Sequence, residues 1–209
     1  MVQKANKDSS MGRKERESAS RREAILDAAQ EMFESIGYVN TTMAQIAGRS
    51  EFGVGTIYQF FSSKQDLFVE VINRSLQYYI SGLEQVLEEK KPLEDGLRAY
   101  MQYNLSWIEE HPEFHRLIYE VFYSPIPDIT SRVLDQFKEI HRRNIDFIRD
   151  IFSHAEEANQ SLDPEIMSLM LLGIVHAISD NWFMGILNKR PTEYIDTIQK
   201  LILGEVKRD

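Results

Sequence analysis

The side chains best suited to chemistry are concentrated in one short, polar segment. Thr56 and Tyr58 carry hydroxyl groups that can donate to phosphate oxygens, and Gln59 carries an amide that can pair with an adenine edge. Lys64 adds a cation at the start of an expected helix, where free backbone amides also attract anions. Gly55 lacks a side chain and permits close approach to a phosphate or a base. These types and spacings indicate contact with a nucleic acid.

The elements that must position these residues are short helices. Capping-box spacing, in which Ser or Thr is followed three residues later by Glu or Gln, predicts helix starts at Ser20 and Thr42. Gly37 ends the first helix, and a break before Val54 separates the second from a third that runs to about Phe60. Short helices joined by a tight turn predict a helix-turn-helix, whose last helix enters the major groove of DNA.

The residues in and around these helices resemble the signature of the TetR family of transcriptional regulators. The resemblance covers residues 22–72 in order and spacing and rests on Ala24-Ile25-Leu26-Asp27-Ala28-Ala29, Phe33, Gly37, Thr41-Thr42, Ile46-Ala47 and the run from Gly55 to Leu67. It implies a homodimeric repressor of a palindromic operator. It also implies a three-helix DNA-binding domain followed by a larger helical domain that binds a small molecule and forms the dimer.

The expected DNA contacts come from the turn, the recognition helix and nearby basic residues. They are Arg21, Arg22, Thr42, Arg49, Gly53, Val54, Gly55, Thr56, Tyr58, Gln59 and Lys64. The turn departs from the family pattern, because Glu51 and Gly53 stand where the family usually has glycine and serine. We therefore expect either a left-handed Glu51 or a turn of different build.

Composition and charge fit a globular protein with two unlike parts. The chain has 209 residues, of which 43% are hydrophobic and 27% charged, and it has no cysteine, which excludes disulfide scaffolds and thiolate chemistry. The net charge of −9 lies in residues 67–209, because residues 1–66 carry nine basic and nine acidic residues. Residues 1–22 are locally basic. This asymmetry indicates a small domain that faces an anion and a larger one that faces something else.

The 3.6-residue apolar periodicity predicts an all-α fold. Further helices are expected at 93–110, 112–123, 127–155, 163–187 and 192–206. We predict three parts: a disordered basic arm at 1–18, a helix-turn-helix domain at 19–66, and a helical ligand-binding and dimerisation domain at 67–209.

Polar residues that interrupt apolar stripes in the second domain predict a small-ligand pocket. The candidate lining residues are Tyr79, Leu83, Tyr103, Asn104, Trp107, Ile118, Phe122, His141, Asn144, Ile148 and His176. Each polar residue taken singly is equally compatible with a satisfied position in the core or at a dimer seam. The expected effector is apolar or aromatic.

The helix expected at 163–187 is apolar nearly all round, so it must bury a second face. Its uncharged run, Ile166 to Ser179, is shorter than the roughly 20 residues of a membrane span, which favours a buried helix over an anchor. The resemblance assigns the last two helices to the dimer, with burial within one subunit as the alternative. The candidate seam residues are Ile174, Ile178, Trp182, Tyr194, Ile198, Leu201 and Ile202.

Enzyme motifs are missing from the sequence. None of the five histidines lies three residues after an acidic residue, as the Glu-x-x-His motif of di-iron bundles requires, and no phosphate loop, G-x-S-x-G elbow or dinucleotide fingerprint occurs. His111 and His115 have metal-ligand spacing, but Pro112 is expected to start the helix and to leave His111 outside it. We expect no enzyme activity, metal or cofactor, and a cytoplasmic location, since no secretory signal is evident. The alternatives are a helical enzyme or carrier that retains a helix-turn-helix, or a structural adaptor.

Overall fold

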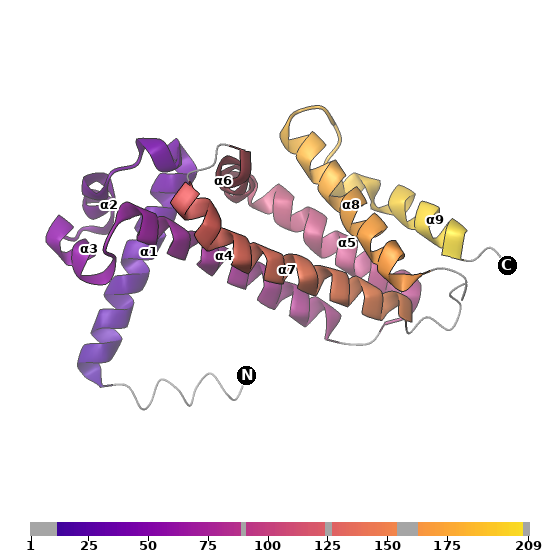
Figure 1. The fold of residues 1–209 in the computed structure, drawn as a ribbon, viewed down its shortest axis with the longest axis horizontal. Helices are drawn as coiled ribbons and strands as arrows, with labels where there is room; N and C mark the ends of the chain where they lie inside the picture. Colours follow the sequence, from indigo (N-terminus) through magenta and orange to yellow (C-terminus); the bar gives the residue numbers. More distant parts are fainter. Residues whose placement is uncertain (1–11, 89–90, 124–126, 154–162, 207–209) are drawn as a thin grey trace. The chain divides into compact units, whose positions relative to one another are not determined.

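The computed structural model describes residues 12–88, 91–123, 127–153 and 163–206. Helices joined by turns make up this part of the chain, and no strand occurs in it, which confirms the all-α prediction (Figure 1). Two compact units are present. One comprises the described residues of Met1–Asn73 and Leu117–Pro125, and the other comprises those of Arg74–Arg116 and Ile126–Asp209.

The first unit contains the predicted helix-turn-helix. Its helices are α1 (Arg13–Asn40), α2 (Met43–Ser50), α3 (Val54–Phe60) and the beginning of α4 (Lys64–Leu87). The second unit contains the rest of α4, α5 (Leu93–Glu110), α7 (Pro127–Ser153), α8 (Pro164–Phe183), the 3₁₀ helix η1 (Pro191–Tyr194) and α9 (Ile195–Val206). Helix α6 (Pro112–Tyr123) contributes residues to both units.

Helix α1 begins earlier than the sequence predicted. It starts at Arg13 in place of Ser20, because the Glu15 carboxylate accepts a 2.8 Å hydrogen bond from the Gly12 amide and Arg13 pairs with Glu17 one turn later. The prediction of a disordered arm at 1–18 is therefore wrong for residues 13–18, and residues 1–11 lie outside the described part. Near its other end α1 is kinked at Gly37, whose φ of 80° and ψ of 164° suit glycine alone.

Aromatic and aliphatic side chains from α1, α2, α3 and α4 form the core of the first unit. The Phe33 and Phe68 rings meet edge to face at 4.9 Å between centroids, and the Tyr38 and Phe68 centroids lie 4.8 Å apart. Ile46 of α2 and Ile57 of α3 are fully buried. Because each short helix buries one apolar side, its opposite side is fixed toward solvent.

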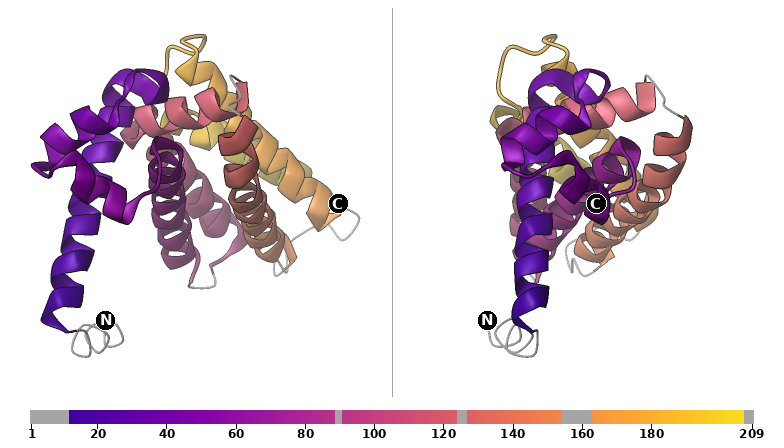
Figure 2. Two further views of the ribbon diagram at one scale, coloured as in Figure 1. Left: turned by 60° about the vertical axis from the view of Figure 1, so that its left-hand side comes forward. Right: turned by 90° about the vertical axis from the view of Figure 1, so that its left-hand side faces the viewer.

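Helix α5 is central to the second unit, because it packs against α7, α8, η1 and α9. Figure 2 shows the helices of this unit, coloured from magenta to yellow, from two further sides. Its buried residues include Leu97, Tyr100, Met101 and Leu105, which join apolar side chains of the neighbouring helices in one core cluster. The helices predicted at 93–110 and 112–123 are observed with the same bounds. The helix expected at 163–187 ends at Phe183, and the last one divides into η1 and α9.

The boundary between the two units differs from the predicted one, which placed the start of the second domain at residue 67. The start of α4 and the segment from Leu117 to Tyr123 belong to the first unit by their backbone contacts. Ile118 and Phe122 therefore belong to the first unit, whereas the other residues predicted to line the pocket belong to the second.

Helix α8 is buried on one side only. Met167, Leu171, Leu172 and Val175 point into the core. On the other side Ile166, Leu169 and Met170 are about half exposed, at 52, 45 and 51%. The helix is long and apolar enough to cross a membrane, yet only a third of its most apolar stretch is buried within the chain.

The residues predicted to form the dimer seam also divide into buried and exposed ones. Ile198 and Ile202 of α9 are buried in the core of the second unit at 4% exposure each, and Ile174, Ile178 and Tyr194 pack partly against that core. The seam prediction is therefore wrong for Ile198 and Ile202. Trp182 is half-buried, and Leu201 is exposed at 61%.

Candidate functional site

The turn between α2 and α3 positions the candidate nucleic-acid interface. Thr42 caps α2 with the predicted box: its hydroxyl accepts from the Gln45 amide at 3.2 Å, and its own amide donates to the Gln45 side chain at 2.8 Å. Glu51 ends α2 in the left-handed conformation, with φ 59° and ψ 24°, the first of the two expected geometries. Phe52 closes the turn by donating its amide to the Ala47 carbonyl at 3.1 Å.

Helix α3 presents a mixed polar face to solvent. Ile57 is fully buried, so the side chains on the other side of this two-turn helix point outward. Tyr58 is exposed at 51% and Val54 at 38%, while Gln59 is exposed and Thr56 half-buried. Gly53 and Gly55 are exposed, and no neighbouring atom of the described residues lies within 4 Å of the position that a Gly55 Cβ would occupy. The structure thus groups these predicted contacts on one accessible surface.

Two of the three predicted arginines already have partners in the first unit. Arg22 pairs with Glu70 at 2.7 Å and lies over the Phe61 ring, 5.2 Å from its centroid. Arg49 pairs with Glu31 at 2.5 Å, and both side chains are more than half exposed. Exposed ion pairs contribute only about 0–1 kcal/mol, so Arg49 can exchange its carboxylate for a phosphate at little cost. Arg21 is exposed.

Lys64, a predicted phosphate contact, has intramolecular partners in this structure. Its ammonium group donates to the carbonyl oxygens of Tyr38 and Thr41 at 2.9 and 2.8 Å, and it lies 4.3 Å from the centroid of the Tyr38 ring. These carbonyls lie at the C-terminal end of α1, where backbone carbonyls find no hydrogen-bond donor within the helix. Burial lowers the pKa of the Lys64 ammonium. Lys64 therefore ties the start of α4 to the end of α1, and its contact with phosphate stays a prediction.

In the second unit, four predicted pocket residues form a closed polar cluster. The Tyr79 hydroxyl lies 2.6 Å from Asn104 Oδ1 and 2.9 Å from Asn144 Oδ1, which also accepts from the Tyr100 hydroxyl at 3.0 Å. The two amide groups donate to backbone carbonyls one turn earlier in their helices. Tyr103 donates its hydroxyl to the Tyr79 carbonyl at 2.6 Å. Burial raises the pKa of Tyr79 and of Tyr100, which keeps both phenols neutral.

Other predicted pocket residues lie elsewhere in the second unit. Leu83 and Ile148 are fully buried in its core, so they are packing residues in this structure. His141 and His176 form a separate pair with ring centroids 5.7 Å apart. Across the described ranges, no group of histidine and carboxylate side chains is arranged to hold a metal ion.

Two predicted residues, Tyr103 and Trp107, line a groove of about 360 Å³ between α4 and α5. The sequence prediction missed Glu110 and Gly82 here. A Cβ at Gly82 would lie 2.3 Å from the Tyr103 hydroxyl oxygen, so only glycine lets this ring lie against α4. An isolated glycine in a helical pattern is the signal that could have indicated such an approach.

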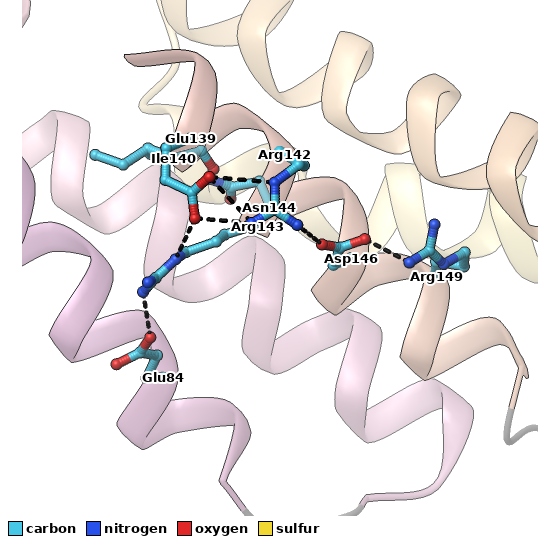
Figure 3. A network of polar contacts seen from close by, with 8 residues as sticks. All are labelled: Glu84, Glu139, Ile140, Arg142, Arg143, Asn144, Asp146 and Arg149. Atoms are coloured by element: carbon cyan, nitrogen blue, oxygen red, sulfur yellow. Dashed lines mark hydrogen bonds and ion pairs between the residues drawn. The ribbon is translucent and has the colours of Figure 1, made fainter. Parts of the chain in front are cut away.

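Charged residues of α7 form an outer network that joins this helix to α4. Figure 3 shows Glu139 bonded to Arg142 and Arg143, and Arg143 continuing to Glu84 of α4 at 2.7 Å. The hydrogen bonds of the two arginines lower the pKa of Glu139. The network adds a surface contact between α7 and α4, the helices that also carry Asn144 and Tyr79 of the polar cluster.

Comparison with known proteins finds a family match within the first unit. The sequence model for bacterial regulatory proteins of the tetR family matches residues 25–71, which include α2, α3 and the turn between them. The chain is 26% identical over 167 residues to the HTH-type transcriptional regulator YhgD of Bacillus subtilis, covering 79% of this chain and 85% of that protein. It is 28% identical over 173 residues to the HTH-type transcriptional activator FasR of Mycolicibacterium smegmatis, covering 83 and 75% of the two chains.

The fold also matches a solved structure over most of its length. The transcriptional regulator FadR from Bacillus subtilis, crystallised in complex with stearoyl-CoA, superposes with a TM-score of 0.67 at 18% identity, covering 88% of this chain and 98% of that chain. The helical arrangement of both units is therefore found in a regulator of known structure.

Proposed function

The chain belongs to the TetR family of transcriptional regulators, and we propose that it is a repressor that binds a palindromic operator as a homodimer and releases it on binding a small effector. The observation that carries this proposal is the outward face of α3, where Tyr58, Gln59 and the two glycines are held above a buried Ile57. A helix of this kind fits the major groove, in which an amide side chain can read an adenine.

We propose that α4 couples effector binding to operator binding. This helix begins at Lys64, which is anchored on the end of α1, and it carries Tyr79 in the polar cluster of the second unit. A ligand that shifts α4 would change the separation of the two recognition helices in a dimer. Half-sites lie about 34–36 Å apart, so a modest change removes one helix from its groove.

The effector class proposed from the sequence is apolar or aromatic. The stearoyl-CoA complex of the Bacillus subtilis regulator adds acyl-CoA to the compounds worth screening. A ligand that favours the DNA-free form must bind more weakly when operator is present, because the coupling between two sites is reciprocal.

A dimer is proposed from the half-exposed side of α8 together with Leu201 of α9. Exposed apolar side chains gathered along one helix mark an interaction surface, and a second copy of the chain is the occupant that the family implies. Leu169→Glu should abolish the dimer without loss of helicity, since Leu169 is outside the subunit core. Tyr78→Glu, at an exposed aromatic of α4, is the matched control.

Light scattering at several protein concentrations measures the outcome. A dimer that persists in Leu169→Glu with unchanged affinity would place the interface elsewhere. Association of the wild-type chain with lipid vesicles would instead assign this side of α8 to a membrane.

DNA binding is tested by selecting duplexes from a random library with the full-length protein. We expect a palindrome among the selected sequences and a loss of discrimination of about 1–3 kcal/mol at one base pair in Gln59→Ala. Gln77→Ala, an exposed glutamine of α4, should bind as the wild type does. Equal binding of all duplexes by the wild type would contradict the proposal, and substrate turnover by the purified chain would favour the enzyme alternative.

A further inference from the structure

A groove between α4 and α5 lies in the second unit, next to the buried polar cluster through Tyr103. It is lined by Val86 of α4 and by one side of α5: Ala99, Gln102, Tyr103, Ser106, Trp107 and Glu110. At about 360 Å³ it lies at the lower end of the range for small-ligand sites. Its walls combine two large aromatic rings with one carboxylate, and this combination points to a definite ligand chemistry.

Both aromatic walls are held in place before any ligand arrives. The Tyr103 ring lies against α4 at Gly82, and its hydroxyl is bonded to the Tyr79 carbonyl. Trp107 is stacked on His111 with centroids 4.0 Å apart and an interplanar angle of 19°, and Tyr79 meets it edge to face at 5.6 Å. Rings fixed in this way lose little conformational entropy when they bind a ligand.

The charge at the groove is negative. Glu110 is exposed and forms no ion pair within the described ranges, whereas Glu109 is bonded to Arg190 at 2.6 Å and to the Thr192 amide at 2.8 Å. The last turn of α5 carries no basic residue, and its carbonyls add the negative end of the helix dipole. Burial, with a contribution from Glu110, raises the pKa of Tyr103 to about 12, so the phenol stays neutral.

We propose that this groove binds an organic cation with a flat apolar body, held over Tyr103 and Trp107 and paired with Glu110. Aromatic faces carry negative potential and attract a cation within about 6 Å, with Trp the strongest partner. The same carboxylate repels an anionic ligand. The inference rests on the proposed function in one respect only, which is that occupancy of the groove acts on the operator.

Three probes of matched shape test the charge preference: 4-hydroxyphenyltrimethylammonium, its neutral isostere 4-tert-butylphenol, and the anion 4-hydroxybenzenesulfonate. Titration calorimetry on the full chain should give the order cation, neutral, anion, with the cation preferred over the isostere by about tenfold. Equal affinities for the cation and the isostere, or tighter binding of the anion, would overturn the proposal.

Variants then locate the site. Glu110→Gln should weaken the cation about fivefold and leave 4-tert-butylphenol unchanged, while Glu94→Gln, an exposed glutamate in the first turn of α5, should change neither. Gly82→Ala should weaken the cation by displacing Tyr103. Unchanged cation affinity in Glu110→Gln would refute the site, even if Gly82→Ala failed to fold.

Operator affinity measured with and without the cation separates this inference from the proposed function. A cation that binds through Glu110 but leaves operator affinity unchanged supports the groove and contradicts its role as the effector site. A protein that selects no DNA can still be titrated with the three probes.

Discussion

Glu51, in the turn between α2 and α3, adopts a backbone conformation that residues other than glycine seldom adopt. It is the one non-glycine residue with positive φ in the described ranges. The left-handed conformation costs an L-residue roughly 1–2 kcal/mol. Glycine avoids this cost, but it loses more conformational entropy on folding, which offsets part of the gain. Glu51→Gly should therefore raise the free energy of unfolding by about 1 kcal/mol. Urea denaturation measures this, and Glu51→Ala, which keeps the Cβ, should show no such gain.

Substitution of Lys64 can distinguish a structural role of this residue from a role in contacting DNA. Lys64→Met keeps the aliphatic length but leaves the Tyr38 and Thr41 carbonyls without their donor, so the free energy of unfolding should fall by about 1–2 kcal/mol. The salt dependence of operator binding should keep its slope, because no phosphate contact is removed. A slope lower by about 1 at unchanged stability would restore the phosphate contact expected from the sequence.

Between elements, His115 links α6 to α8. Its Nε2 lies 3.2 Å from an Asp180 carboxylate oxygen, and its ring meets Phe183 edge to face. Burial lowers the pKa of His115, and Asp180 opposes this shift. Above the unfolded pKa of about 6.5 the imidazole is neutral in both states, and below it the unfolded chain takes up the proton first.

The free energy of unfolding should therefore fall as the pH drops from about 7.5 to about 5.5, and His115→Gln should remove part of that fall. Asp180→Asn removes the group that opposes burial, so the loss contributed by His115 should become larger. Denaturation curves at several pH values measure both effects. A pH dependence unaltered in His115→Gln would show that this histidine titrates alike in the folded and unfolded states.

At the level of whole elements, the sequence predicted the helices where apolar periodicity and capping signals agree, as at Thr42 and Gln45. It placed the start of α1 at Ser20, because the earlier Gly12 cap and the Arg13–Glu17 pair precede any apolar stripe. It did not predict which side of α8 is buried, since an all-round apolar helix has no amphipathic signal. The groove depends on the packing of Tyr103 on Gly82, and the isolated glycine indicates a close approach without identifying the residue that makes it.

For the whole molecule, the central claim is that two copies of this chain bind one palindrome through their α3 helices. Native mass spectrometry of the protein with a selected duplex tests it most directly. We predict two chains per full palindrome, loss of that complex when the duplex is cut to a single half-site, and the same loss for Leu169→Glu on the intact palindrome. A stable complex of one chain per duplex, equally tight on the half-site, would contradict the account.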